Sequence, residues 1–192
     1  MTSTENTMSP TIAALYVDRG GIYDRPDVDL WPEDRDARLY RGPLPVVAHP
    51  PCERWSALAH IHKHREGMAL GDDGGCFAAA VEAVERWGGV LEHPARSAAW
   101  AAFGLPPATA QGWARTLYRP GWACQVEQGS YGHLAPKATW LYYVGSTPPP
   151  PLRWGPSGAT GRIDLLSSRD PRRRQTPPEF AEVLMGMARG AR

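Results

Sequence analysis

The sequence lacks the features that mark membrane, secreted and disulfide-stabilised proteins. No apolar stretch among its 192 residues approaches the ~20 residues that a membrane-spanning helix requires. The first residues, MTSTENTMSPT, contain neither the basic start nor the hydrophobic segment of a secretion signal. The three cysteines are an odd number and form no CxxC pair, which argues against a disulfide framework and a zinc ribbon. We therefore expect a cytoplasmic protein with no membrane partner.

The sequence also has little net charge and no clear metal motif. The formal net charge is +1, although from residue 152 onward eight arginines face only four acidic residues. Such a bias is compatible with contact to phosphates but is too small to prove it. His60, His62 and His64 alternate without a second ligand pair at fixed spacing, so we predict no metal site.

The apolar patterns predict a single compact α/β domain with a mostly parallel sheet covered by helices. Strands are expected at residues 12–17, 45–48, 90–92, 122–126 and 139–144, and helices at 71–87, 97–103 and 178–189. Residues 28–40 suit a small strand or turn that passes into a short helix. We expect a frayed N-terminus (1–11), a main domain (12–146), a linker rich in proline and arginine (147–175) and a C-terminal helix that packs back on the domain (176–192).

The most informative stretch is Pro50-Pro51-Cys52, which follows the strand expected at residues 45–48. Open α/β sheets bind their ligands outside the carboxyl ends of the strands. The two prolines remove two backbone donors and fix φ twice, so they form a stiff exit that can hold a thiol in one orientation. Taken alone, the stretch also suits a proline-rich turn with an incidental half-buried cysteine.

Four segments, in order, resemble the motifs of the DNA cytosine carbon-5 methyltransferases over nearly the whole chain. Residues 49–56 (HPPCERWS) are similar to the catalytic loop, a Pro-Cys followed by a polar residue, an aromatic residue and a serine. Glu92-His93-Pro94 falls where the family has Glu-Asn-Val. Residues 121–145 resemble the region in which a tyrosine-glycine turn precedes a basic strand, and residues 176–180 (TPPEF) look like the closing segment. The resemblance implies a Rossmann-like class I methyltransferase-type sheet with helices on both faces, in which residues 12–146 form the catalytic domain.

The chemistry of this family explains why these residues belong together. Carbon 5 of a pyrimidine becomes reactive when a thiolate adds at carbon 6, and the resemblance assigns that thiolate to Cys52, with Pro51 and Ser56 in the same loop. Addition is easier beside a carboxyl group that burial keeps partly neutral, a role that suits Glu92. Glu92 alone suits a pair with Arg96 equally well. His49 replaces a family glycine and either lowers the pKa of Cys52 when protonated or serves only as a turn residue.

The resemblance also implies a cofactor and a substrate. The expected cofactor is S-adenosyl-L-methionine, held by Asp18, Gly20 and Gly21 after the first strand and by Asp29 and Glu33. The expected substrate is DNA or a free pyrimidine nucleotide. Its contacts are expected at Arg54, Tyr131, Lys137, Thr139, Arg172, Arg173 and Arg174. Cys76 and Cys124 are expected in the core.

Two departures from the family keep other functions open. The family's Phe-x-Gly-x-Gly loop is altered at residues 17–23, and the segment between Gly145 and Thr176 is too short for a separate target-recognition domain. The first interpretation is a compact, phage-type DNA methyltransferase whose specificity is relaxed or supplied by a protein partner. The alternatives are a non-catalytic methyltransferase-fold protein that binds DNA or a partner, and a base-modifying enzyme that uses a different donor.

Overall fold

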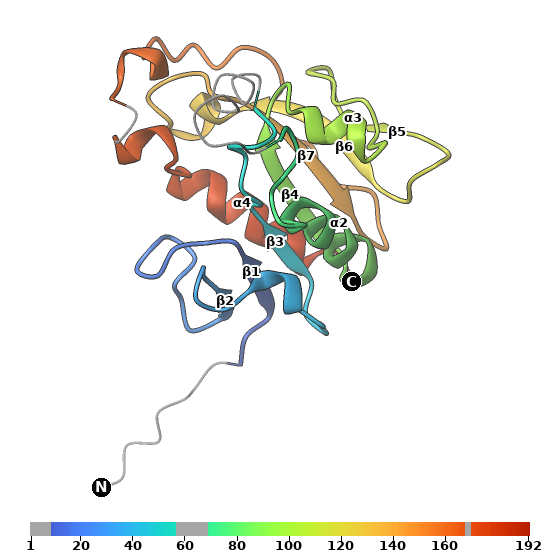
Figure 1. The fold of residues 1–192 in the computed structure, drawn as a ribbon. Coiled ribbons are helices and arrows are strands. Elements are labelled where there is room, and N and C mark those ends of the chain that lie inside the picture. The colour runs from blue at the N-terminus through green and yellow to red at the C-terminus, as the bar shows by residue number, and fades with distance from the viewer. Residues whose placement is uncertain (1–8, 57–68, 168–169) are drawn as a thin grey trace, which may run out of the picture.

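A mixed seven-stranded sheet forms the centre of the protein (Figure 1). The structure is a computed structural model that describes residues 9–56, 69–167 and 170–192. The strand order is β2-β1-β3-β4-β7-β6-β5. The strands are β1 (Ile12–Leu15), β2 (Val28–Trp31), β3 (Val46–Ala48), β4 (Gly89–Pro94), β5 (Ala114–Arg115), β6 (Trp122–Glu127) and β7 (Ala138–Val144).

The sheet is parallel in one half and antiparallel in the other. Strands β1 to β4 pair in parallel, as the alternation of strands and helices predicts. Strands β5, β6 and β7 instead pair antiparallel, and β7 is antiparallel to β4. The expectation of a mostly parallel sheet is therefore wrong for this half. The connection between β6 and β7 covers residues 128–137, which contain the 3-10 turn η2 (Gln128–Tyr131). A connection this short, without a crossover helix, joins antiparallel neighbours.

Two long helices cover opposite faces of the sheet (Figure 1). On one face, Val47 and Val90 share a buried cluster with α4 (Pro178–Arg189). On the other face, Val46 and Leu91 share a cluster with α2 (Cys76–Trp87). Because successive strand residues point to opposite sides, these neighbouring pairs serve two cores. The predicted covering of both faces is confirmed.

The helices begin and end where local residues permit. Helix α2 starts at Cys76, later than predicted, because Gly74 and Gly75 have positive φ angles and cannot continue a right-handed helix. The Asp73 carboxylate accepts a hydrogen bond from the Phe77 amide (2.8 Å) and so caps the first turn. Ser97 caps the short helix α3 (Ala98–Ala102) in the same way, through the Ala99 amide (3.2 Å).

Several described residues of the segment 147–175 are hydrogen-bonded to the domain. It contains two 3-10 turns, η3 (Ile163–Leu165) and η4 (Pro171–Arg173). The Arg153 amide donates to the Tyr131 hydroxyl (2.9 Å), and the Gly161 amide donates to the Leu134 carbonyl (2.9 Å). At its end, Arg174 pairs with Glu53 (2.8 Å), so the segment returns to the loop that follows β3. Over the described residues, no helix is both long and apolar enough to cross a membrane.

Candidate active site at the carboxyl edge of the sheet

Four strands bring the predicted site residues to one edge of the sheet. The parallel strands β3 and β4 both end at this edge, in front of Cys52 and at Glu92. Strand β7 runs the opposite way and therefore begins there, just after Lys137. Strand β6 runs with β4 and ends at Glu127, so Gln128 also arrives at this edge. The topology thus joins segments that lie far apart in the sequence.

The Glu92 carboxylate is the centre of a buried hydrogen-bond network. Its Oε2 accepts from Nδ1 of His49 (2.9 Å). Its Oε1 accepts from Nε2 of Gln128 (3.1 Å) and from the Thr139 hydroxyl (3.2 Å). The Glu92 side chain is only 12% exposed. The alternative pairing with Arg96 is wrong, because both carboxylate oxygens have other partners.

This environment keeps Glu92 ionised. Burial by itself raises the pKa of the Glu92 carboxyl, but the hydrogen bond and charge of His49 and the charge of Lys137 outweigh it and lower the pKa below its usual value. The prediction of a carboxyl kept partly neutral by burial is therefore wrong. A carboxylate that accepts three hydrogen bonds is better suited to orient its donors than to give up a proton.

Cys52 lies beside this network in a tightly anchored turn. Its carbonyl accepts from the Trp55 amide (3.0 Å), and the Trp55 ring is buried, with Nε1 donating to the Asp73 carboxylate (2.8 Å). Burial raises the pKa of the half-buried Cys52 thiol, and the charges of Glu92 and Glu53 raise it further. The charge of Arg174 acts in the opposite direction. At neutral pH the thiol therefore carries its proton.

Lys137, just before β7, is a cation that interacts electrostatically with both Glu92 and Cys52. Burial lowers its pKa, while the charges of Glu92 and Cys52 raise it. Its ammonium donates to the Gln175 carbonyl (2.8 Å), which attaches the end of the 147–175 segment to the site. The predicted residues Cys52, Glu92, Lys137 and Thr139 thus belong to one cluster.

His93 is a residue of the site that sequence reasoning did not single out. It follows Glu92 on β4 and therefore points to the opposite face, where its ring contacts the edge of Phe77 (centroids 5.0 Å apart). Neither ring nitrogen has a hydrogen-bond partner, and the approach to the Pro51 backbone falls short of hydrogen-bond geometry. Burial lowers the pKa of His93 to about 4, so the ring is neutral beneath the Cys52 loop. A histidine directly after the motif glutamate was the available signal.

The expected cofactor residues fit a methyl donor only in part. Gly20 has open space around it, and Glu33 is exposed just after β2. The Gly20 amide, however, already donates to the Asp24 carboxylate (2.7 Å). Asp29 lies inside β2, where it accepts from Nε1 of Trp31 (2.9 Å) and pairs with Arg35. Asp18 and Gly21 are joined by a long hydrogen bond (3.4 Å) within the turn. Because two of the groups are committed to bonds within the protein, we derive no step through S-adenosyl-L-methionine.

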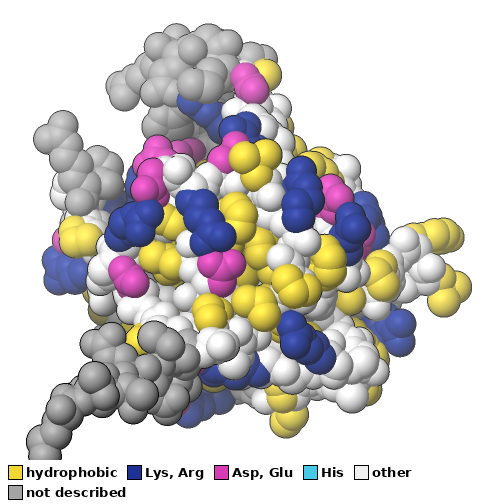
Figure 2. All heavy atoms as spheres, turned by 90° about the horizontal axis from the view of Figure 1, so that it is seen from below, with side chains coloured by type: hydrophobic (Ala, Val, Ile, Leu, Met, Phe, Trp, Pro, Cys, Tyr) yellow, Lys and Arg dark blue, Asp and Glu magenta, His cyan; other side chains and the backbone are white. Residues whose placement is uncertain are grey.

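The expected nucleic-acid residues are dispersed, and several are engaged within the protein. Arg172 pairs with Asp170 (2.7 Å), and Arg174 pairs with Glu53 (2.8 Å). Arg173 donates to the carbonyls of Ile163 (2.6 Å) and Leu166 (2.9 Å). Two other residues expected to contact nucleic acid lie apart from these arginines: Tyr131 is buried against Phe180, and the Arg54 carbonyl accepts from the Gly71 amide (2.9 Å). Pro51 and Ser56, predicted as catalytic residues, lie in the Cys52 turn. On the face drawn in Figure 2, basic and acidic side chains are interspersed rather than gathered by sign.

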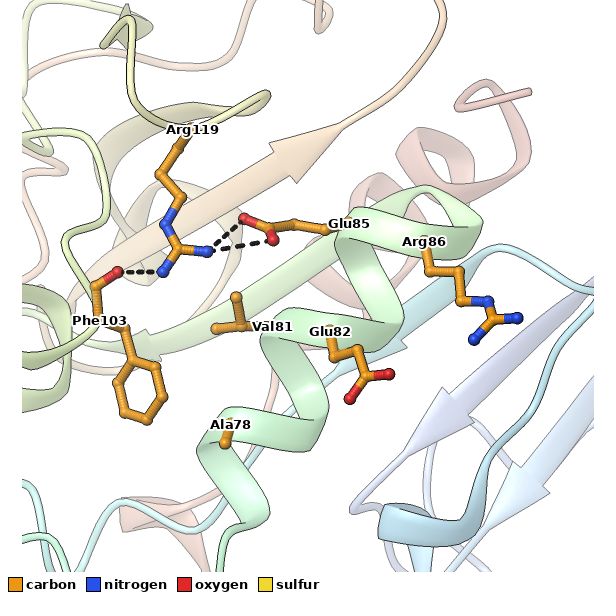
Figure 3. Close-up of a pocket in the computed structure, with 7 residues that line it drawn as sticks. All are labelled: Ala78, Val81, Glu82, Glu85, Arg86, Phe103 and Arg119. Carbon is orange, nitrogen blue, oxygen red and sulfur yellow. Dashed lines mark hydrogen bonds and ion pairs between the residues drawn. The ribbon is translucent and has the colours of Figure 1, made fainter.

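Helix α2 carries a pocket that is separate from the Cys52 cluster. Its volume is about 370 Å³, and its wall holds an ion pair between Arg119 and Glu85 (3.0 Å) (Figure 3). Arg119 also donates to the Phe103 carbonyl (2.6 Å), and the Tyr142 hydroxyl donates to Glu85 (2.8 Å). These bonds brace the β5–β6 connection against α2. The pocket is lined by Ala78, Val81, Glu82, Glu85, Arg86, Phe103 and Arg119.

Of the two cysteines expected in the core, the structure buries one and leaves the other partly exposed. Cys124 is fully buried in β6, as expected of a core residue. Cys76, also expected in the core, is the first residue of α2 and is partly exposed. The described residues contain no group of three His, Cys, Asp or Glu side chains that could hold a metal ion. His60, His62 and His64 lie outside the described residues.

Comparison with known proteins gives this chain no relative: no family model, curated protein or solved structure matches it.

Proposed function

We propose that this protein is a pyrimidine-modifying enzyme of the DNA cytosine carbon-5 methyltransferase type, with Cys52 as its nucleophile. The observation that carries the proposal is the meeting of Cys52, Glu92 and Lys137 at one edge of the sheet, each within electrostatic reach of the others. Ligand sites of open α/β sheets lie at such carboxyl edges. A Rossmann-like methyltransferase sheet is part of the proposal, supported by the parallel strands β1 to β4 and by the helices on both faces.

The proposed step is addition of the Cys52 thiolate to carbon 6 of the base. The sulfur forms a bond to carbon 6, and the electron pair of the carbon 5–carbon 6 double bond moves into the ring, so that carbon 5 becomes nucleophilic. Lys137 and the ordered Glu92 network would face the base edge. Because the ring atoms are shielded in a duplex, the base must leave the stack or arrive as a free nucleotide.

Covalent trapping with a fluorinated base tests this proposal. The protein is incubated with single-stranded DNA that contains 5-fluorocytosine, with and without S-adenosyl-L-methionine, and its intact mass is measured. We expect an adduct in the wild type and in Cys76→Ala, the matched control that loses a partly exposed thiol elsewhere. Cys52→Ala should form none. A parallel arm with a free 5-fluorinated cytidine nucleotide distinguishes a polymer substrate from a monomer.

A non-catalytic role is the second candidate, and specific contacts favour it. The thiol pKa is raised rather than lowered, and Asp29 is already paired with Arg35. In that case the fold would bind DNA or a protein partner without modifying a base. Absence of an adduct from the wild type under every condition, with or without the donor, would favour this candidate over the enzyme.

A further inference from the structure

The connection between β5 and β6 carries an apolar tip that the chain itself leaves uncovered. Leu117 is 100% exposed and Tyr118 is 92% exposed, the two highest values among the large hydrophobic side chains of the described residues. Apolar residues scattered singly over a surface are ordinary. Two large ones side by side in one loop instead form an apolar projection, which suits contact with a partner.

The tip is held in place against helix α2. Arg119, the residue after the tip, donates to both carboxylate oxygens of Glu85 (3.0 and 3.1 Å) and to the Phe103 carbonyl (2.6 Å). On the other side of the tip, the Thr116 hydroxyl accepts from the Tyr118 amide (3.3 Å). Ordering a loop is one of the costs of association, and a loop that is already braced in the free protein avoids part of that cost.

The projection lies next to the pocket on α2, because Arg119 forms part of the pocket wall (Figure 3). The pocket has a volume of about 370 Å³, and Ala78, Val81 and Phe103 supply its apolar wall. A cavity of roughly 150 Å³ holds a benzene ring, so this pocket has room for an aromatic ring and an aliphatic side chain together. The exposed tip does not enter the pocket of its own chain. A projection beside a pocket that suits it is the arrangement of a two-fold interface, in which residue i contacts j and j contacts i.

The charges on the exposed face of α2 favour a second copy of the chain as the partner. Glu82 and Arg86 are exposed, lie four residues apart and both line the pocket. Among the described residues no ion pair involves either side chain, and Arg86 lies over the Trp87 ring (5.0 Å). When a two-fold axis places two copies of a helix antiparallel, opposite charges at this spacing pair twice across the axis. The whole chain carries a formal net charge of only +1, so little repulsion opposes its self-association.

We propose that this face of the protein is the interface of a two-fold symmetric homodimer. Leu117 and Tyr118 of each chain fill the pocket of the other. The α2 helices lie antiparallel across the axis, with Glu82 of each chain facing Arg86 of the second copy. The pocket is separate from the Cys52 cluster, so the proposal does not depend on base modification.

Sedimentation equilibrium of the full chain over a wide range of concentrations tests the proposal. By mass action the wild type should pass from the mass of one chain to that of two and no further, because a two-fold interface closes. The variant Leu117→Asp, Tyr118→Ser should bind its own copy at least about tenfold more weakly. Leu165→Asp, the matched change at another exposed leucine, should associate like the wild type.

Charge exchange tests the arrangement of the two helices. Glu82→Arg and Arg86→Glu should each weaken association about tenfold, since like charges then face each other across the axis. The double variant Glu82→Arg, Arg86→Glu should recover the affinity of the wild type. Thermal unfolding of each variant, measured at a concentration at which the wild type is dissociated, separates a loss of association from a loss of the fold.

Three results would overturn the homodimer. The first is a wild type that keeps the mass of one chain at every concentration, which would assign the exposed tip to a different kind of partner. The second is a mass that rises beyond two chains, and the third is a tip variant that associates like the wild type. A double charge exchange that fails to recover would overturn the antiparallel arrangement of α2. The 5-fluorocytosine adduct is measured separately, so the proposed function stands or falls independently of these results.

Discussion

At the scale of single residues, the site depends on neighbours in β4 that face opposite sides of the sheet. Glu92 enters the ordered network with His49, Gln128 and Thr139, whereas His93 lies unpartnered on the α2 face. The first residue is stabilised in its charged form and the second in its neutral form. Lowering the pH should therefore reduce the stability of the fold through both residues. The loss from His93 should begin at the higher pH, because a histidine in the unfolded chain binds its proton at a higher pH than a glutamate does.

His93 gives a prediction for stability against pH. Its pKa in the folded protein is about 4 because of burial, against 6.5 for the exposed side chain. Between these values the unfolded chain binds a proton that the folded protein does not, so stability falls as the pH falls. The wild type should lose about 3 kcal/mol of unfolding free energy from this residue between pH 7 and 4. Urea unfolding at several pH values measures the loss.

His93→Leu is the matched variant for this test. Leucine cannot titrate, and it leaves no buried nitrogen without a partner beside Phe77. The loss between pH 6.5 and 4.5 should therefore be much smaller in the variant than in the wild type. Equal losses in both proteins would show that His93 is hydrated or paired in solution.

At the scale of elements, α4 joins the end of the chain to its beginning. The helix contacts β1, β3, β4 and η2. Its buried side chains share one cluster with Ile12 and Val90, while its exposed face carries Glu182, which pairs with Arg25. The apolar face of α4 is thus part of the main core, and the site edge of the sheet depends on it.

Truncation of one buried residue of α4 should destabilise the whole domain. Leu184 is fully buried, so Leu184→Ala should cost about 2–5 kcal/mol through lost contacts and a residual cavity. Glu182→Ala removes only an exposed ion pair on the same helix and should cost about 1 kcal/mol or less. Chemical denaturation followed by tryptophan fluorescence compares the two. A similar small cost for both would mean that α4 is not integral to the fold.

At the scale of the whole molecule, the surface offers limited support for strong nucleic-acid binding. Charges of both signs are mixed on the face of Figure 2, and Arg172, Arg173 and Arg174 have partners within the protein. Any DNA contact through this segment must compete with Asp170 and Glu53. Weak, salt-sensitive and sequence-tolerant binding is therefore the expected behaviour.

The double variant Arg172→Ala, Arg174→Ala tests that contact. Arg173 is omitted because its bonds to two backbone carbonyls support the segment. If both exchanged arginines reach phosphates, the slope of log affinity against log salt should flatten by up to about 2 units, at about 0.9 for each contact. Fluorescence anisotropy with labelled duplex DNA measures the slope. An identical slope in wild type and variant would show that Arg172 and Arg174 do not touch DNA.

The sequence alone determined the elements and the reactive segment. Apolar periodicity indicated α4 with its observed limits and located β3, and the position of Cys52 after a buried strand indicated the edge at which it lies. These are local properties, because spacing, prolines and glycines act over a few residues. Even here, β5 was missed, since a strand of two residues has no periodic pattern.

Only the tertiary structure decided what the site residues do. The sequence predicted Glu92 as a buried carboxyl or a partner of Arg96. Its charge state depends instead on His49, Gln128 and Thr139, which reach it from the end of β3, from η2 and from β7. The partners of Arg174 and Asp29 were equally invisible in the sequence. Ionisation is set by every charge and donor within a few ångströms. Those neighbours are fixed by the strand order, which no local pattern specifies.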